Sequence, residues 1–268
     1  SIAVIGASQE LATISGQVLN HLLNTGYQGR AYPVNPRRSE ILGLRCHASV
    51  LDLPETPDLA VIVIGAAHVP AALRQCGEKG IPFAIILSAG FSELGEEGRR
   101  LQRQLVDIAD AFGIGVIGPN CQGMMSVANR VRAGFGSAFG AEHAPGEVSM
   151  VSQSGGFGYA VMTLASKQEG IRHRHVVTTG NEIGISTLEI LEHYIADPGT
   201  TIITAYTEGM RDARRLVEVG DRALAAGKPI LIWKVGNSEQ GQKAAASHTA
   251  NLGGAMALYR SAFRQTGI

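Results

Sequence analysis

The stretch Glu147-Val148-Ser149-Met150-Val151-Ser152-Gln153-Ser154-Gly155-Gly156-Phe157 decides the fold of this chain. It begins as a run of apolar residues typical of a buried strand, passes through a serine and glycine turn, and continues as a helix. Free N–H groups at such a helix start bind phosphate, because the positive end of the helix dipole lies behind them. A plain helix N-cap is the alternative interpretation of this turn.

The same strand, turn and helix order repeats to the end of the chain. Alternation of this kind predicts a doubly wound parallel sheet with right-handed crossovers. We expect strands at residues 147–151, 175–178, 201–206 and 229–235, and helices at residues 157–169, 186–195, 211–226 and 254–266.

The first half of the chain shows the same alternation without repeating the sequence. Its expected strands are residues 2–5, 31–34, 59–64, 83–87 and 115–117, and its expected helices are residues 18–23, 69–76 and 98–111. Residues 126–146 lose periodicity and end in a proline and glycine turn, which is typical of a linker. We therefore predict one domain over residues 1–125, a linker over 126–146 and a second domain over 147–268.

Composition excludes several classes of protein. The 268 residues carry 23 basic and 23 acidic side chains, so no net field favours nucleic acid or an anionic membrane. The three cysteines form no C-x-x-C pair, which argues against a disulfide framework or a thiolate zinc site and fits a reducing cytoplasm. No apolar run approaches the roughly 18 residues that span a bilayer, and the sequence enters its first strand pattern without the basic and apolar regions of a signal peptide. We expect a soluble cytoplasmic protein without a metal site of its own.

Ligands of doubly wound sheets bind at the carboxyl ends of the strands. In the second domain these are the loops at residues 152–156, 179–184, 207–209 and 236–248. His248 lies there among small side chains, although a lone histidine is more commonly a surface or core residue. Glu208 follows a strand and could orient an imidazole and stabilise its positive charge, or be an ordinary solvated loop acid.

The first domain carries signals for an adenosine ligand with an extra phosphate. Its first strand runs into Gly6-Ala7-Ser8 rather than the G-x-G-x-x-G of ordinary NAD sites. Its second strand ends in Asn35-Pro36-Arg37-Arg38, where NAD sites usually place an acidic residue. Arginine favours a ribose phosphate, which both NADP and coenzyme A offer, unless both arginines are merely solvated charges.

Five motifs in order make the chain similar to a known family. They are Gly6-Ala7-Ser8, Tyr32-Pro33-Val34-Asn35-Pro36, Glu40-Ile41-Leu42-Gly43, Ser88-Ala89-Gly90-Phe91 and Gly118-Pro119-Asn120-Cys121. Together they resemble the CoA-binding domain of the NDP-forming acyl-CoA synthetases, relatives of succinyl-CoA synthetase. The resemblance implies a Rossmann-like CoA-binding domain followed by a flavodoxin-like domain. It also implies a CoA site lined by Gly6, Ala7, Ser8, Ser15, Asn35, Pro36, Arg37, Ser88, Ala89 and Asn120.

The resemblance extends through the second domain. Ser247-His248-Thr249 matches the segment whose histidine is phosphorylated in this family, and Glu208 matches its catalytic glutamate. The turn of Ser152, Gln153, Ser154, Gly155 and Gly156 resembles the family's phosphate-binding helix start. The chain departs from the usual pattern at Ala250, where the family has glycine, and at Ile183-Gly184, where it tends to have alanine and aspartate.

The resemblance implies an acid–thiol ligase. A carboxylic acid is activated as an acyl phosphate, CoA displaces the phosphate, and His248 relays the phosphoryl group. Nothing in the sequence resembles an ATP-grasp domain, so ATP or ADP with Mg²⁺ is expected on an ATP-grasp, beta-type subunit or domain, and residues 1–268 alone should not complete the reaction. We also expect an oligomer. The alternatives are a non-catalytic CoA-binding regulatory module, as in multidomain protein acetyltransferases, and an NADP-dependent oxidoreductase, which would leave His248 unexplained.

Overall fold

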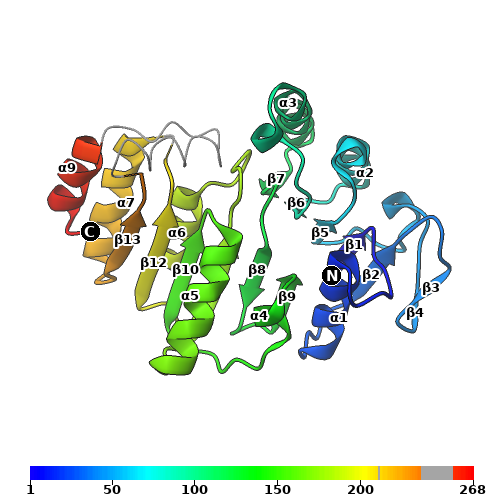
Figure 1. Ribbon diagram of the computed structural model, residues 1–268, viewed down its shortest axis with the longest axis horizontal. Helices are drawn as coiled ribbons and strands as arrows, with labels where there is room; N and C mark the ends of the chain where they lie inside the picture. Colours follow the sequence, from blue (N-terminus) through cyan, green and yellow to red (C-terminus); the bar gives the residue numbers. More distant parts are fainter. Residues whose placement is uncertain (211, 237–255) are drawn as a thin grey trace.

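The computed structural model describes residues 1–210, 212–236 and 256–268. Two sheets lie side by side along the long axis of the molecule, with the first half of the chain in one and most of the second half in the other (Figure 1). The first sheet is fully parallel and has the order β2-β1-β5-β6-β7. Its strands are β1 (Ile2–Ile5), β2 (Ala31–Val34), β5 (Leu59–Ile62), β6 (Phe83–Ile86) and β7 (Gly115–Ile117), and its helices are α1 (Ile14–Asn24), α2 (Val69–Lys79) and α3 (Glu96–Phe112).

A short bridge beside β2 completes the Rossmann order of this sheet. Val34 pairs in parallel with His47, just after the small hairpin of β3 (Glu40–Ile41) and β4 (Leu44–Arg45). Counting this bridge as the third strand gives the order 3-2-1-4-5-6, whose switch point lies between β1 and β5. The predicted Rossmann-like fold of the first half is confirmed.

The second sheet has the order β13-β12-β10-β11-β8-β9. Its parallel strands are β10 (Val148–Ser152), β11 (His173–Thr178), β12 (Ile202–Thr207) and β13 (Ile230–Lys234), and its helices are α5 (Gly155–Gln168), α6 (Thr187–Ala196), α7 (Ala213–Ala225) and α9 (Met256–Thr266). Since β10 lies between β11 and β12, the parallel part has flavodoxin-like order, with its switch point between β10 and β12. The predicted second doubly wound fold is confirmed.

The segment expected to be a linker is more ordered than predicted. β8 (Gly123–Ser126) pairs antiparallel with β11, and β9 (Val131–Gly134) pairs with β8, so both extend the second sheet. The short helix α4 (Ser137–Gly140) follows. The sequences Gly-Met-Met-Ser and Val-Arg-Ala-Gly alternate too weakly to be recognised as strands. Residues 123–126 and 131–134 thus belong to the second sheet, and the domain limits themselves stay a prediction.

One apolar core runs through both halves. Val4 and Leu22 of the first half belong to the same cluster of buried side chains as Leu191 and Leu216 of the second half. A second cluster fills the other face of the first sheet, where Leu73 of α2 and Leu105 of α3 are fully buried. Because a shared core resists relative movement, the loops at the ends of both sheets keep a fixed relation.

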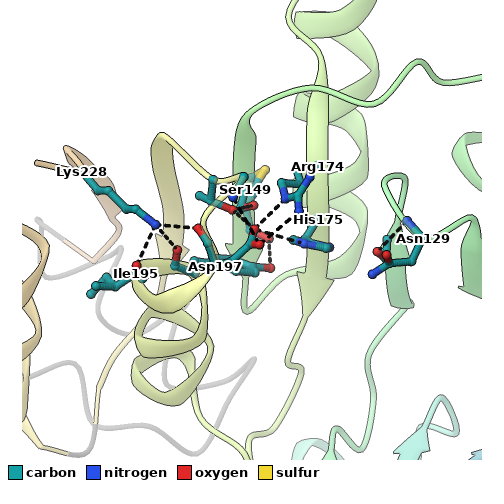
Figure 2. Close-up of polar contacts among 12 residues, drawn as sticks. Asn129, Ser149, Arg174, His175, Ile195, Asp197 and Lys228 are labelled. Atoms are coloured by element: carbon teal, nitrogen blue, oxygen red, sulfur yellow. Dashed lines mark hydrogen bonds and ion pairs between the residues drawn. The ribbon is translucent and has the colours of Figure 1, made fainter. Parts of the chain in front are cut away.

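A polar network holds the amino ends of the second sheet together, away from the loops at the carboxyl ends. Asp197 follows α6 and accepts a hydrogen bond from Arg174 Nε at 2.6 Å (Figure 2). It accepts a second one from Thr200 Oγ1 at 2.6 Å. Lys228 Nζ donates to the carbonyl oxygens of Ile195 at 2.7 Å and Asp197 at 2.6 Å. The lysine thereby satisfies carbonyl groups that the end of α6 leaves without helical partners.

Two further findings concern the described residues as a whole. None of their helices is both long and apolar enough to cross a membrane. The three cysteines, Cys46, Cys76 and Cys121, are buried and unpaired with one another, and burial raises the pKa of the Cys76 thiol to about 12. These thiols are therefore core residues rather than nucleophiles.

Candidate active site

A cavity of about 740 Å³ opens at the carboxyl ends of both sheets. Residues from both halves of the chain line it, as expected where the switch points of two doubly wound folds face each other. Of the residues predicted from the sequence, the cavity is lined by Ser15, Ser88, Ala89 and Asn120 of the first half and by Gln153, Ser154, Gly155, Gly156 and Glu208 of the second. The tertiary structure thus brings the two predicted sites into one space.

The remaining predicted residues of the first domain lie beside the cavity, along the same edge of the first sheet. Asn35, after β2, donates its side-chain amide to the carbonyl oxygen of Ala7, after β1, at 2.9 Å. Its Oδ1 atom accepts the backbone N–H of Arg37 at 2.9 Å, and the Arg37 side chain is exposed. Gly6, Ser8, Asn35, Pro36 and Arg37 therefore lie on one surface at the ends of β1 and β2, whereas the side chain of Ala7, also predicted to line the CoA site, is fully buried.

Gly6 is required by the close approach of two loops at the switch point. Its φ of 88° is a conformation that favours glycine, and a Cβ atom there would lie 2.4 Å from the carbonyl oxygen of Val63. The loop after β5 can therefore reach the turn after β1. This contact links the surface around Asn35 to the cavity, which Val63 and Ile64 also line.

Ser88 ties the loop after β6 to its neighbours. Its hydroxyl group donates to the carbonyl oxygen of Ile64 at 2.5 Å and accepts the N–H of Ile64 at 3.3 Å. The N–H of Asn120 donates to the carbonyl oxygen of Ser88 at 2.9 Å. The Ser88 hydroxyl is thus hydrogen-bonded within the protein, both as donor and as acceptor.

The start of α5 has the form expected of an anion site. Ser154 is its N-cap and accepts the N–H of Phe157 at 3.4 Å. The N–H groups of Gly155 and Gly156 belong to the first turn, where amides have no intrahelical acceptor. Ser152 is fully buried, and its hydroxyl group donates to the carbonyl oxygen of Ser154 at 2.6 Å, so Ser152 supports the turn without lining the cavity.

Gln153 serves the neighbouring loop. Its side chain is 3% exposed, and its Oε1 atom accepts the N–H groups of Glu208 at 2.5 Å and Gly209 at 3.1 Å. Its Nε2 atom donates to the carbonyl oxygen of Gly209 at 2.7 Å. These bonds join the ends of β10 and β12 and fix the backbone of Glu208, which carries the predicted catalytic carboxylate.

A buried cation lies beneath Glu208. Lys234, at the end of β13, is 5% exposed, and its Nζ atom donates to the carbonyl oxygen of Glu208 at 2.9 Å. Burial lowers the pKa of Lys234, while the nearby Glu208 carboxylate acts in the opposite direction. Tyr259 of α9 lies 5.0 Å from the same ammonium group and accepts the N–H of Met210 at 2.8 Å. Side chains of Gln153, Lys234 and Tyr259 therefore all bind the backbone of residues 208–210.

The fourth loop of the second domain, residues 179–184, folds around a buried acid. Glu182 is 2% exposed, and its Oε1 atom accepts hydrogen bonds from Thr179 Oγ1 at 2.7 Å and the N–H of Thr187 at 3.0 Å. Burial raises the pKa of this carboxyl group. At the departure from the family pattern, Gly184 packs closely on β7, because a Cβ atom there would lie 2.9 Å from the Val116 carbonyl oxygen.

Some predicted residues cannot be placed. His248 and Ala250 belong to residues 237–255, which lie outside the described part of the chain. Among the described residues, histidine, cysteine, aspartate and glutamate side chains form no group of three or more that could hold a metal ion.

Sequence reasoning missed several residues of the site. Gln122 and Phe135 line the cavity, and Gln122 directly follows the Gly118–Cys121 motif. Asn181 lines it as well, from a loop in which the sequence gives this residue no evident role. Lys234 carried a usable signal, because a lysine at the end of an apolar strand sequence requires a partner when it is buried.

Two family models match this chain. A CoA binding domain matches residues 1–126, and a succinyl-CoA ligase like flavodoxin domain matches residues 145–268. The whole chain is 40% identical to ADP-forming acetate–CoA ligase I of Archaeoglobus fulgidus, of which it covers 38%. It is also 40% identical to the alpha subunit of ADP-forming acetate–CoA ligase I of Pyrococcus furiosus, of which it covers 58%.

A solved structure of a related enzyme is also similar to the whole chain. Acetyl-coenzyme A synthetase 1 of Ca. Korarchaeum cryptofilum, described as dinucleotide forming and solved with phosphate and ADP, is similar over the entire chain with a TM-score of 0.92 and 37% identity. The chain covers 56% of that protein chain. The chain therefore spans between about two fifths and three fifths of the length of these two curated relatives.

Proposed function

The chain belongs to the ADP-forming acyl-CoA synthetases, in which it corresponds to the alpha-type portion, and we propose that it binds CoA and transfers phosphoryl groups in such an enzyme. The activity proposed is that of an acid–thiol ligase. The remaining part of the enzyme is proposed to be an ATP-grasp partner, present as a subunit or as a further domain.

One observation carries this proposal: a single cavity receives the predicted CoA loops and the predicted phosphate loop. Ser88, Ala89 and Asn120 approach it from the first sheet, and Ser154 to Gly156 approach it from the second. A CoA-dependent displacement of phosphate needs the thiol and the acyl phosphate in contact, because catalysis of this kind depends on proximity and orientation. A pure CoA-binding module has no need of a second, anion-binding edge.

The surface at the ends of β1 and β2 fits the adenosine end of CoA. Asn35 fixes the Gly6–Ser8 turn, and the exposed Arg37 side chain is proposed to bind the ribose phosphate. The pantetheine arm would run past residues 63–65 and 88–89 into the cavity. The backbone groups of these loops offer the hydrogen bonds that an amide-containing arm accepts and donates.

Thioester formation follows from this arrangement. The CoA sulfur attacks the carbonyl carbon of an acyl phosphate, the C–S bond forms, and the C–O bond to phosphate breaks. Phosphate leaves with the electron pair, and the thiol proton passes to the released phosphate or to solvent. The helix start at Gly155 and Gly156 stabilises the charge that develops on the phosphate.

His248 is proposed to carry the phosphoryl group in the step that makes the acyl phosphate, before CoA attacks it. The acyl phosphate is made when a carboxylate oxygen takes the phosphoryl group from the phosphorylated histidine, or the reverse occurs when the acid is released. Glu208 is proposed to hold the imidazole in the reactive tautomer and to stabilise its positive charge. Its backbone is fixed by Gln153 and Lys234, which keeps the carboxylate in place.

The nucleotide is proposed to be ATP or ADP with Mg²⁺, bound by the ATP-grasp partner. The acid is proposed to be a carboxylic acid of the class for which the relatives are named, with acetate the first to test. A substrate panel with the reconstituted enzyme decides which acid is used. The three unpaired cysteines support a reducing, cytoplasmic location.

Phosphoryl labelling tests the proposed function. The full-length protein is incubated with its nucleotide-binding partner and ATP labelled in the γ-phosphate. We expect an acid-labile label on the wild-type chain, loss of the label in His248→Ala, and retention in His68→Ala, an exposed histidine outside the cavity. Added acid and CoA should discharge the label and yield acyl-CoA. Tight CoA binding without any label would overturn the ligase proposal in favour of the regulatory module.

A further inference from the structure

The two domains meet along a backbone seam at the edge of the first sheet. The N–H groups of Asn181, Ile183 and Ile185 donate to the carbonyl oxygens of Pro119, Gly118 and Val116 at 2.9, 3.1 and 2.8 Å. β7 is the last strand of its sheet; Ile185 binds its free edge at Val116, and Asn181 and Ile183 bind the turn that follows the strand. The loop after β11 is therefore bonded to the first domain as well as to its own.

Asn181 adds a side-chain contact to this seam. Its side chain is 5% exposed, and its Nδ2 atom donates to Glu93 Oε2 at 2.8 Å, to Gln102 Oε1 at 2.9 Å and to Ser92 Oγ at 3.2 Å. Its Oδ1 atom lies 3.4 Å from the donating Asn120 Nδ2 atom. All four partners belong to the first domain, so this one amide spans the boundary.

Glu93 passes the contact on to a cavity loop. Its other carboxylate oxygen accepts the N–H groups of Gly90 at 2.7 Å and Phe91 at 3.1 Å. These amides belong to the loop whose residues Ser88 and Ala89 line the cavity. Burial alone would raise the pKa of Glu93, yet hydrogen bonds from Asn181, Gly90 and Phe91 outweigh it and hold the pKa below its usual value. The contact is thus a charge-assisted one.

We propose that Asn181 is a positioning residue that holds the loop of residues 88–91, through Glu93, against the phosphate-binding start of α5. The inference rests on the proposed function, because it assigns the thiol end of CoA to this loop. Asn181 is not proposed to react. Its amide fixes the separation between the CoA loop and the acyl phosphate, and a shift of about 1 Å in such a separation can cost on the order of a hundredfold in rate.

The proposal separates two parts of the reaction. Attack of the CoA sulfur on the acyl phosphate needs the loop of residues 88–91 and the start of α5 at the correct separation. Transfer of the phosphoryl group between ATP and the protein needs the second domain and the partner, and it does not involve the loop of residues 88–91. Loss of the Asn181 contact should therefore slow only the CoA-dependent part.

Asn181→Asp is the sharpest test, because it keeps the shape of the side chain and places a carboxylate opposite Glu93. In the full-length protein with its partner, we expect acyl-CoA formation to fall by about tenfold or more. The rate of labelling by ATP in the absence of CoA should stay within about twofold of wild type. Asn129→Asp makes the same chemical change at an exposed asparagine outside the seam and should alter neither rate.

A second variant distinguishes loss of this contact from general destabilisation of the fold. In Asn181→Asp combined with Glu93→Gln, the donor and acceptor exchange places. The amide nitrogen introduced by Glu93→Gln can donate to the new carboxylate, while the amide oxygen still accepts the N–H groups of Gly90 and Phe91. We expect acyl-CoA formation to recover to within about threefold of wild type. General destabilisation of the fold would not be repaired by this exchange.

Two outcomes overturn the inference. Equal loss of labelling and of acyl-CoA formation in Asn181→Asp, without recovery in the double variant, would make Asn181 merely structural. Wild-type rates for both reactions would give it no role. Failure of the proposed function looks different, because the wild-type protein itself would then take no label or form no acyl-CoA.

Discussion

The side-chain oxygen of Gln153 accepts the backbone N–H of Glu208 at 2.5 Å, across the switch point of the second sheet. The sequence predicts that one of these residues binds phosphate and that the other is catalytic. The contact makes them a unit, because the turn at the start of α5 sets the position of the Glu208 loop.

The first prediction concerns Gln153. Gln153→Ala removes the acceptor for the N–H groups of Glu208 and Gly209 and the donor to the Gly209 carbonyl oxygen. Leaving these buried groups unpaired should lower the free energy of unfolding by about 1–3 kcal/mol. Phosphoryl labelling should fall by about tenfold, because the Glu208 backbone is released. Thermal denaturation and labelling rates measure the two effects, with the exposed Gln28→Ala as control. An unchanged labelling rate would contradict the positioning role.

The second prediction concerns the Glu208 carboxylate. Glu208→Gln keeps the backbone contacts with Gln153 and Lys234 and removes only the negative charge. We expect the rate of phosphoryl labelling to drop by about a hundredfold or more. Thermal stability should fall as well, because the buried Lys234 loses the nearby negative charge that favours its charged form. Glu218→Gln, an exposed acid on α7, is the matched control. A drop of the same size in both variants would argue against a specific role for Glu208.

The third prediction concerns Arg37. If its exposed guanidinium binds the ribose phosphate of CoA, Arg37→Ala should weaken CoA binding by about tenfold. Binding of dephospho-CoA, which lacks that phosphate, should be unaffected. Titration calorimetry with both ligands checks this, and Arg45→Ala on β4 serves as the control. Equal weakening of both ligands would place Arg37 elsewhere on the CoA molecule.

The fourth prediction concerns pH and His173. Burial, together with the nearby His143, lowers the pKa of His173 from its ordinary 6.5 to about 4. The folded state thus disfavours the charged form, so the stability from the neutral ring is present above pH 6.5 and is lost as the pH falls towards 4. The loss amounts to about 3 kcal/mol. His173→Asn should flatten the dependence of unfolding free energy on pH in this window. Denaturant unfolding at a series of pH values measures it, and an unchanged slope would refute the assignment.

The fifth prediction separates stability from activity at the opposite end of the second sheet. Lys228→Met removes the ammonium group that caps the carbonyl oxygens at the end of α6. We expect a loss of about 1–3 kcal/mol in unfolding free energy. CoA binding and labelling at a temperature where the variant is folded should match wild type, because Lys228 is remote from the cavity loops. Lys167→Met on α5 is the matched control. A loss of labelling without a loss of stability would be inconsistent with this assignment.

Much of the fold could be predicted because its signals are local. The parallel strands and the longer helices in the described ranges follow apolar patterns within a few residues, such as 31–34 for β2 and 115–117 for β7. The antiparallel pair β8 and β9 was missed, because its four-residue strands contain few apolar positions and depend on β11 for pairing. The predicted roles of His248 and of the CoA-site residues stay predictions.

The sequence by itself determined the order of strands, turns and helices and the polar residues at each carboxyl end. These depend on periodicity and turn chemistry within a few neighbouring residues. Only the tertiary structure decided that loops from both sheets share one cavity, that Gln153 binds the loop 55 residues further along, and that Asn181 binds Glu93 across 88 residues. Such contacts follow from the packing of the two sheets around a common core, and no local pattern encodes that packing.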